Sequence, residues 1–498
     1  MKNDLNEPCG SAKVSDPASL QRRSFVKGVV SLSAGMAALP FSLHAGQSQS
    51  PAPTPAASGS SGADAVPIIP SSGIGRYFQV VYPPSQTPGE LRIGVNYTLW
   101  VPDGIETIRG VIVHQHGAGM TAAHFGAYSA YDLQWQAFAK KWDCALLGPS
   151  YHVLNDGDLG AAGSDYWFDP RLGSDKTFVK ALGDLAAQTG HAELAVVPWV
   201  LWGHSAGAGW VDVIATLHPE RVVALYYRSG SPLTWADRPA MYPPVAIPAA
   251  AYAIPRMCSI GVKEKGLMHV LQATYDLYHS NGAPTGFALD PRTGHECGDS
   301  RYFAIPFLDA CMAMRMPEKG SNTQSLNQTL RPVDQSQAWL AAYPGDTAVP
   351  ASEFKGDPKQ AAWLPNAAVA AAWMQYVKYG TVGEASIPPA PVNVHVSAKG
   401  DQGIEITWDA EASMDGGLGG FIVLRDGHGT ARLPQLAPED VYGRPLFQGL
   451  SFHDTPTDPL PKMTYLDTSA KAGVTHSYTV IALSSGGVPS LPSTPASI

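Results

Sequence analysis

The sequence is poor in charged residues, and this shortage excludes one class of partner. Only 15% of its 498 residues are charged, and its 33 basic and 42 acidic residues leave a net charge of −9. Lysine and arginine form no cluster beyond the N-terminus, whereas a nucleic-acid-binding surface usually needs one. We therefore expect no nucleic-acid partner.

The sequence also lacks an apolar run long enough to span a membrane. The best candidate is residues 28–43, a moderately apolar run that contains glycine and serine and is too short to cross a bilayer. Arg22 and Arg23 precede this run, and residues 43–45 (Leu-His-Ala) form a plausible cleavage site. Residues 1–45 thus resemble a twin-arginine signal peptide, which implies a periplasmic or secreted protein.

Cysteine is scarce as well, with five in the chain and no C-x-x-C pair. Neither a zinc site nor a redox motif is indicated, and we expect no metal and no organic cofactor. Cys9 would leave with the signal peptide. The remaining even number permits one or two disulfides in an oxidising compartment, without fixing the pairing; for Cys258 and Cys297, a disulfide and two buried thiols are both open. The remaining four are Cys144, Cys258, Cys297 and Cys311.

What the sequence does contain, after a Pro/Ala/Ser/Gly-rich linker at residues 46–70, is a regular alternation of strand and helix patterns. Over residues 71–386 this alternation predicts an α/β domain with a mostly parallel, eight-stranded sheet covered on both faces, and two antiparallel strands leading in. Beyond residue 312 only a helix at residues 366–379 is readable, and we interpret that part as an extension. The expected strands are residues 77–82, 91–101, 110–115, 144–148, 197–202, 222–227, 254–260 and 286–290; the expected helices are residues 132–140, 176–189, 210–218 and 266–279.

One strand end carries Gly203-His204-Ser205-Ala206-Gly207. An apolar strand precedes it and a helical pattern follows, which is the G-x-S-x-G arrangement of a nucleophile elbow. There the serine occupies a strained turn, and the glycines let strand and helix pass closely. Chance could supply this pattern in a chain with 50 glycines, so an acid and a histidine must follow at later strand ends.

An acid and a histidine do follow, in the Ser-acid-His order that this kind of elbow requires. Glu264 and His295 come just after the last two expected strands, and the carboxyl ends of parallel strands share one edge of the sheet. We predict Ser205 as the nucleophile, His295 as the general base and acid, and Glu264 as the carboxylate that orients the imidazole. Asp237, after the preceding strand, stays open as the alternative acid.

A tetrahedral intermediate also needs fixed N–H donors for its negative charge. We predict the backbone N–H of Ala206, next to the nucleophile, as the first donor. The second is predicted at Ala118, with Gly119 close behind, in the His-Gly-Ala-Gly turn after the third strand. His116 in the same turn is expected to order the loop.

Together these motifs resemble those of α/β-hydrolases, over residues 75–315. His-Gly-Ala-Gly, Gly-His-Ser-Ala-Gly, Gly-x-x-Glu and Gly-His-Glu resemble the secreted esterase group related to polyhydroxybutyrate depolymerases and feruloyl or acetyl xylan esterases. The resemblance implies hydrolysis of carbohydrate, aryl or polyester-type carboxylic esters through an acyl-enzyme. A serine peptidase on the same fold is the alternative, with Arg228 as the only visible anchor for a peptide terminus.

Residues 387–498 differ in composition and show short alternating strands separated by turns, typical of a small β-sandwich. Ile-Thr-Trp, Phe-Ile-Val-Leu-Arg-Asp-Gly and Tyr-Thr-Val segments occur in the order of a fibronectin type III domain, which this region resembles. We expect Trp408 and Tyr478 in its core and contact with a polysaccharide or cell surface as its role. A binding protein with an inactive hydrolase domain is the competing hypothesis.

Aromatic residues near the strand ends are predicted to border the substrate pocket, although some should be core residues because Trp and Tyr commonly pack inside. Such a pocket suits a small-molecule or polymeric ester better than an anion. The acidic loop at residues 155–165 lacks the regular ligand spacing of a calcium site and is interpreted as a solvated loop. The predicted pocket residues are Tyr151, Tyr166, Trp167, Trp210 and Trp235.

Overall fold

The structure is a computed structural model, and it describes residues 74–152, 167–235, 244–319, 329–383, 386–434, 446–471 and 473–498. The predicted signal peptide and linker, the acidic loop, Tyr166 and Asp237 all lie outside the described residues. Within the described part of the chain, no helix is both long and apolar enough to cross a bilayer.

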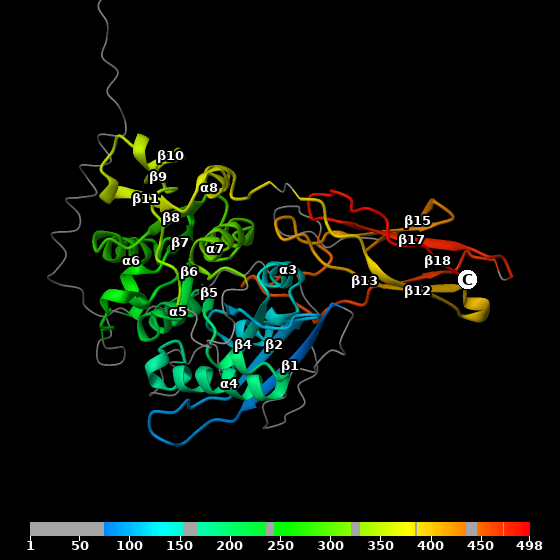
Figure 1. The fold of residues 1–498 in the computed structure, drawn as a ribbon, viewed down its shortest axis with the longest axis horizontal. Helices are drawn as coiled ribbons and strands as arrows, with labels where there is room; N and C mark the ends of the chain where they lie inside the picture. Colours follow the sequence, from blue (N-terminus) through cyan, green and yellow to red (C-terminus); the bar gives the residue numbers. More distant parts are fainter. Residues whose placement is uncertain are drawn as a thin grey trace, which may run out of the picture. The chain divides into compact units, whose positions relative to one another are not determined.

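The larger sheet has eight strands in the order β1-β2-β4-β3-β5-β6-β7-β8 (Figure 1). Neighbouring strands from β4 through β8 pair in parallel, while β2 pairs antiparallel with both β1 and β4. The predicted mostly parallel, eight-stranded sheet is therefore confirmed, as are the two leading strands that pair antiparallel; of all eight, β2 alone runs against the rest. The strands are β1 (Gly75–Tyr82), β2 (Val95–Pro102), β3 (Gly110–Gln115), β4 (Cys144–Tyr151), β5 (Trp199–His204), β6 (Val222–Arg228), β7 (Arg256–Gly261) and β8 (Thr285–Asp290).

The central strands are buried along their whole length because helices cover both faces of the sheet. Every residue of β3, β4, β5, β6 and β7 is buried, as expected for parallel strands between two helical layers. One layer contains α4, α5 and α6, and the other contains α3, α7 and α8 (Figure 1). These helices, with the short α2 (Met120–Gly126), are α3 (Leu133–Lys141), α4 (Ser174–Thr189), α5 (Ala206–Leu217), α6 (Met268–Ser280), α7 (Arg301–Arg315) and α8 (Ala367–Tyr379).

Helix α7 is missing from the sequence prediction, for a physical reason. Most of its residues are buried, and Pro306, a residue that ordinarily interrupts a helix, lies inside it. The extension after it also contains a small antiparallel sheet, in the order β10-β9-β11, that the sequence did not predict. Its strands are β9 (Trp339–Ala342), β10 (Ala348–Pro350) and β11 (Ala361–Leu364).

The C-terminal region is all-β, as predicted, and consists of two antiparallel sheets around a second hydrophobic core. Trp408 and Tyr478 are both buried in that core. Leu133 of helix α3 belongs to the same cluster, so the core is shared with the larger domain. One sheet has the order β12-β13-β16, and the other β15-β14-β17-β18. Their strands are β12 (Val392–Ala398), β13 (Ile404–Asp409), β14 (Gly420–Arg425), β15 (His428–Leu433), β16 (Thr464–Asp467), β17 (Ser477–Leu483) and β18 (Ala496–Ser497).

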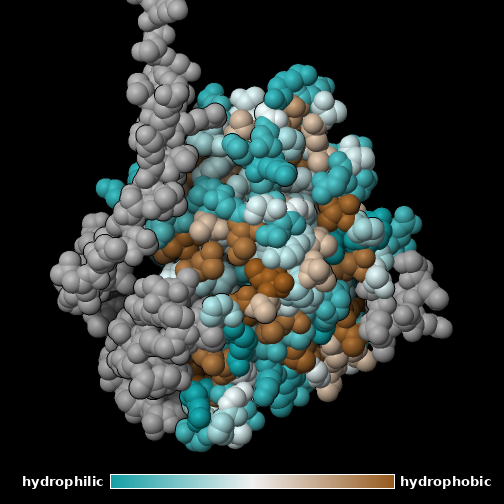
Figure 2. Space-filling model, turned by 90° about the vertical axis from the view of Figure 1, so that its left-hand side faces the viewer, coloured by the Kyte–Doolittle hydropathy of each residue, from teal (hydrophilic) through white to brown (hydrophobic). Residues whose placement is uncertain are grey.

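One face of the molecule carries apolar patches between hydrophilic residues (Figure 2). More than half of a folded protein's accessible surface is ordinarily apolar, so such patches indicate no function by themselves. The functional argument therefore depends on the strand ends of the large sheet.

Candidate active site

Ser205 lies on a tight turn between β5 and α5, at a backbone φ of 55° that side-chain-bearing residues rarely adopt. Two glycines make the turn feasible. A Cβ on Gly203 would lie 2.4 Å from the carbonyl oxygen of Gly207, and a Cβ on Gly207 would lie 2.4 Å from that of His116. The glycines of the elbow are thus required by close backbone contacts on both sides of the serine.

Ser205, His295 and Glu264 form one hydrogen-bonded chain. Ser205 Oγ lies 3.0 Å from His295 Nε2, and His295 Nδ1 lies 2.8 Å from Glu264 Oε2. The two partners occupy the loops after β8 and β7, which are packed against each other: a Cβ on Gly261 would meet the carbonyl oxygen of Thr293 at 2.2 Å. Ser205 and His295 are 90 residues apart in the sequence, and Glu264 and His295 are 31 apart. The fold brings all three within hydrogen-bond distance at one edge of the sheet.

The charge state of Glu264 determines which atoms donate and which accept in the hydrogen bonds between Ser205, His295 and Glu264. Its hydrogen bond with His295 holds the pKa of the carboxyl below its usual value, although partial burial opposes this shift. A second hydrogen bond, from the N–H of Gly266 at 2.9 Å, occupies its other oxygen. An ionised carboxylate only accepts hydrogen bonds, so His295 Nδ1 carries a proton and the neutral ring presents Nε2 as an acceptor to Ser205.

Arg228 restrains the loop that carries His295. Its guanidinium is fully buried and donates to Thr293 Oγ1 at 2.6 Å and to the carbonyl oxygen of Glu296 at 2.5 Å, so the loop is held on both sides of the histidine. Under the peptidase alternative, Arg228 is expected to anchor a peptide terminus. That role is wrong in this structure, because the side chain is closed to solvent and is bound within the protein.

The two predicted oxyanion donors border the serine. Ala206 is the first residue of α5, and the N–H groups of a first helical turn have no partner within the helix. Ala118 lies in the loop between β3 and α2, where a Cβ on the adjacent Gly117 would be 3.2 Å from Ser205 Cβ. Both N–H groups therefore belong to segments that contact the nucleophile.

His116 orders the loop that contains Ala118. Its Nδ1 donates to the carbonyl oxygen of Gly117 at 2.5 Å, and its Nε2 accepts from the N–H of Tyr151 at 3.1 Å. Burial lowers the pKa of His116 to about 4, so the ring is neutral and one nitrogen can donate while the other accepts.

The predicted pocket residues Tyr151, Trp167 and Trp210 are core residues instead. Their exposed fractions are 0–1%, and the rings of Tyr151 and Trp167 stack at 4.5 Å between centroids. Trp210 donates its indole N–H to Ser174. Proximity to strand ends could be inferred from the sequence, but burial under helix α4 could not. Trp235 ends the 3-10 helix Pro232–Trp235.

The four cysteines that the structure describes, Cys144, Cys258, Cys297 and Cys311, are free and buried. Of the two possibilities left open for Cys258 and Cys297, the structure has two buried thiols. Burial raises the pKa of the Cys297 thiol well above its ordinary value. Among the described residues, no group of three or more His, Cys, Asp and Glu side chains could hold a metal ion.

The sequence analysis missed a contribution from the C-terminal region. His453 Nδ1 lies 2.8 Å from His204 Nδ1, and His204 Nε2 lies 2.8 Å from the carbonyl oxygen of His295. Phe452 also contacts this group, with its ring centroid 6.1 Å from that of His295. No sequence motif marks these residues, because they lie in a turn between strands of a different sheet.

The sheet order, the nucleophile elbow and the Ser-acid-His order define the α/β-hydrolase fold. The chain is similar to two solved structures over about half of its length. An S-formylglutathione hydrolase from Agrobacterium tumefaciens is 16% identical, with 49% of this chain and 95% of that chain covered and a TM-score of 0.35. A ferulic acid esterase is 14% identical, with 48% and 99% covered and a TM-score of 0.36.

A third similarity concerns a shorter stretch. A Fn3-like protein from Clostridium thermocellum is 21% identical, with 22% of this chain and 92% of that chain covered and a TM-score of 0.15. No protein-family model and no curated protein matches the sequence. With TM-scores below 0.5, these similarities carry no argument about function, which must be inferred from the site.

Proposed function

We propose that the protein is a serine hydrolase that cleaves carboxylic esters through an acyl-enzyme. The observation that carries this proposal is the continuous chain from Ser205 Oγ through the imidazole of His295 to the carboxylate of Glu264, with both links at 3.0 Å or less. A serine hydroxyl is a weak nucleophile unless a neighbouring base takes its proton, and this arrangement supplies the base.

In the first half of the reaction, Ser205 Oγ attacks the ester carbonyl carbon while His295 Nε2 takes the hydroxyl proton. The carbonyl oxygen becomes an oxyanion, which the N–H groups of Ala206 and Ala118 stabilise. His295 then returns the proton to the alcohol oxygen as the C–O bond breaks. Glu264 holds the ring in the required tautomer and stabilises its cationic form throughout.

In the second half, a water molecule replaces the alcohol. His295 takes a proton from the water as its oxygen attacks the acyl carbon, and then protonates Ser205 Oγ as the acid leaves. The chemistry requires no redox partner, because one water is consumed and one acid and one alcohol are formed. Neutral esters, of carbohydrate, aryl or polyester type, are the substrate class, because a protein with a net charge of −9 repels anionic substrates.

Covalent labelling tests the proposal directly. A fluorophosphonate should label the wild-type protein and a Ser280→Ala control, in which an exposed helical serine is lost, but not Ser205→Ala. The wild type should also hydrolyse p-nitrophenyl acetate. Absence of labelling in the wild type would refute a serine mechanism, and cleavage of peptides without cleavage of esters would assign the site to a peptidase.

Export is a second part of the proposal and concerns residues outside the described range. The twin-arginine pattern at Arg22 and Arg23 supports a periplasmic or secreted location, with residues 71–386 as the hydrolase domain and 387–498 as a fibronectin-like domain. Exchange of both arginines for lysine should retain the precursor in the cytoplasm. Unchanged export of that double variant would contradict this route.

A further inference from the structure

A loop at residues 449–457 of the C-terminal region is closed on itself. The N–H of Thr457 donates to the carbonyl oxygen of Gly449 at 2.9 Å, and the N–H of Ser451 donates to that of Thr455 at 2.7 Å. The hydroxyls of Ser451 and Thr455 are also 2.7 Å apart. These bonds make the loop a compact turn that presents residues 452–454 at its tip.

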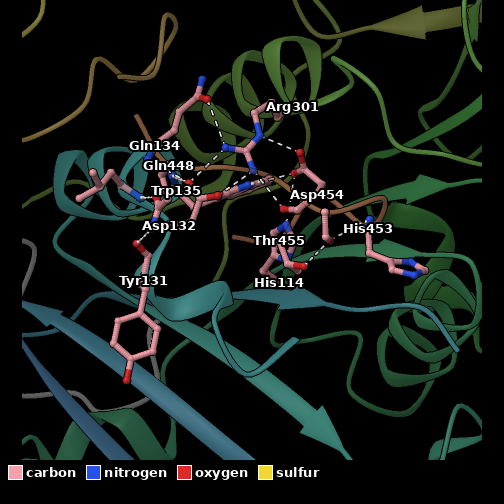
Figure 3. Close-up of polar contacts among 12 residues, drawn as sticks. His114, Tyr131, Asp132, Gln134, Trp135, Arg301, Gln448, His453, Asp454 and Thr455 are labelled. Carbon is pink, nitrogen blue, oxygen red and sulfur yellow. Dashed lines mark hydrogen bonds and ion pairs between the residues drawn. The ribbon is translucent and has the colours of Figure 1, made fainter. Parts of the chain in front are cut away.

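The 449–457 loop is fixed to the α/β-hydrolase domain by a buried ion pair (Figure 3). Arg301 of α7 donates to Asp454 Oδ1 at 2.7 Å and to the Asp454 carbonyl oxygen at 3.0 Å, while its other side binds Asp132 at 2.7 Å. His114 and Trp135 lie 3.3 Å from the second carboxylate oxygen. This set of partners determines where the tip of the loop lies.

A second anchor lies beside the first. Gln448, at the start of the loop, accepts from the N–H of Leu133 at 3.2 Å and donates to the carbonyl oxygen of Tyr131 at 2.8 Å (Figure 3). The side chain of His453 points away from Arg301 in the same view, and its Nδ1 lies 2.8 Å from Nδ1 of His204. The loop is therefore held at its base and at its tip.

Phe452 is the exposed member of this anchored tip. Phe452 as a whole residue is 50% exposed, whereas Asp454 and Thr455 are buried. Its backbone is nevertheless fixed, because its carbonyl oxygen accepts from the N–H of Cys297 at 3.1 Å. The ring lies nearly parallel to the imidazole of His295, at an interplanar angle of 29°. A large apolar ring is thus held at the solvent side of the histidine.

The reaction fixes which part of an ester would meet this ring. The leaving alcohol must lie close to His295, since this residue delivers its proton, whereas the acyl carbon and its oxyanion lie at Ser205 and the backbone donors. A side chain packed on His295 and open to solvent therefore borders the alcohol side of the site.

We propose that Phe452 is a specificity-determining residue that contacts the alcohol part of the ester and favours a flat apolar group, such as a benzyl or aryl ring. The C-terminal region then forms part of the substrate site. This inference rests on the proposed function. Stacking of an aromatic group on the ring corresponds to a three- to tenfold preference over a small alkyl group.

Two acetate esters test the inference on the full-length chain. Benzyl acetate and ethyl acetate yield the same acetyl-enzyme and release alcohols of similar acidity, so the ratio of their kcat/KM values reports contacts to the alcohol. Phe452→Ala should lower the benzyl-to-ethyl ratio about three- to tenfold. Phe452→Tyr should restore it, and Leu491→Ala, which removes an exposed apolar side chain between β17 and β18, should leave it unchanged.

The ratio stays informative if a variant is partly unfolded, because both substrates are measured on the same sample and the active fraction cancels. An unchanged ratio in Phe452→Ala, with both esters hydrolysed, would overturn the inference and leave the proposed function intact. Failure of the wild type to hydrolyse either ester and to react with a fluorophosphonate would overturn both.

Discussion

The imidazole rings of His453 and His204 lie 2.8 Å apart between their Nδ1 atoms. A carbonyl oxygen only accepts, so His204 Nε2 donates to that of His295, and His204 Nδ1 is left to accept from His453. Burial lowers the pKa of His204 well below its ordinary value and that of His453 to about 3, so both rings are neutral. The C-terminal region thus positions the main chain of His295.

Replacement of His453 should disturb this positioning. His453→Leu removes the donor to His204 and should lower kcat/KM up to about tenfold, the equivalent of one neutral hydrogen bond. His453→Asn retains an N–H close to the position of Nδ1 and should restore most of the activity. Steady-state kinetics on both variants measure the difference, and equal losses in the two would show that the hydrogen bond is not what matters.

Glu264→Gln should lower kcat about 10⁴-fold, because an amide cannot hold His295 in the required tautomer or stabilise its cation. Asp237→Asn should leave kcat unchanged if Glu264 is the acid of the triad. Pre-steady-state measurement of acylation with p-nitrophenyl acetate separates this effect from deacylation. A large loss of kcat in Asp237→Asn, with little loss in Glu264→Gln, would identify Asp237 as the acid.

Gly207→Ala should disrupt the elbow. The new Cβ would lie 2.4 Å from the carbonyl oxygen of His116, so strand, loop or helix must shift next to Ser205. A shift of about 1 Å at a catalytic residue costs about 10²-fold in rate. Gly183→Ala is the matched control, because Gly183 lies in α4 and nothing lies within 4 Å of the new Cβ. This variant should retain activity, and the substitution should stabilise the protein by about 0.5–1 kcal/mol.

Acid should weaken the anchor of the 449–457 loop. Burial alone would raise the pKa of Asp454, but the charge of Arg301 and its hydrogen bonds hold this pKa below the ordinary value. A carboxyl whose folded pKa is depressed stabilises the fold above its unfolded pKa of about 4, and this stabilisation is lost as pH falls through the folded pKa.

Urea denaturation at pH 7 and at pH 3 measures this contribution. At pH 7, Asp454→Asn should lower the unfolding free energy by about 3 kcal/mol, because it removes one partner of a buried ion pair. The difference between variant and wild type should shrink at pH 3. An undiminished difference at low pH would mean that Asp454 stabilises the protein by packing and not by its charge.

The buried thiols should be unreactive in the folded protein. In a Cys9→Ser variant, 5,5′-dithiobis(2-nitrobenzoate) should titrate no thiol under native conditions and four after unfolding in guanidinium, since Cys144, Cys258, Cys297 and Cys311 are all buried and free. Dithiothreitol should not change activity. Fewer than four thiols in the unfolded protein would reveal a disulfide.

The sequence was sufficient to predict the sheet and the positions of its functional strand ends, because those depend on short-range patterns. The apolar strand, the glycines around Ser205 and the turn that contains His295 are each readable within a few residues. Their convergence follows from a general property of parallel sheets, that carboxyl ends share an edge. The assignment of catalytic roles stays a prediction that the variants above test.

The interpretations that failed depend on packing between distant segments. Trp167 and Trp210 are buried because α4 and its neighbours cover them, and the sequence does not show that cover. Arg301 and Asp454 are 153 residues apart and belong to a helix and a turn that are unremarkable locally. A buried ion pair leaves no periodic pattern in the sequence, so the part of the site that comes from the C-terminal region could not be predicted.

The separation of Arg301 and Asp454 also sets an order of events during synthesis. The ribosome produces Asp454 153 residues after Arg301, a delay of roughly 8–30 s at 5–20 residues per second. Through that interval Arg301 has Asp132 but not Asp454 as a carboxylate partner, and His204 lacks its hydrogen-bond partner His453. Ser205, Glu264 and His295 are therefore all synthesised well before the 449–457 loop that packs beside them, and the synthesis of that loop determines when these contacts can form.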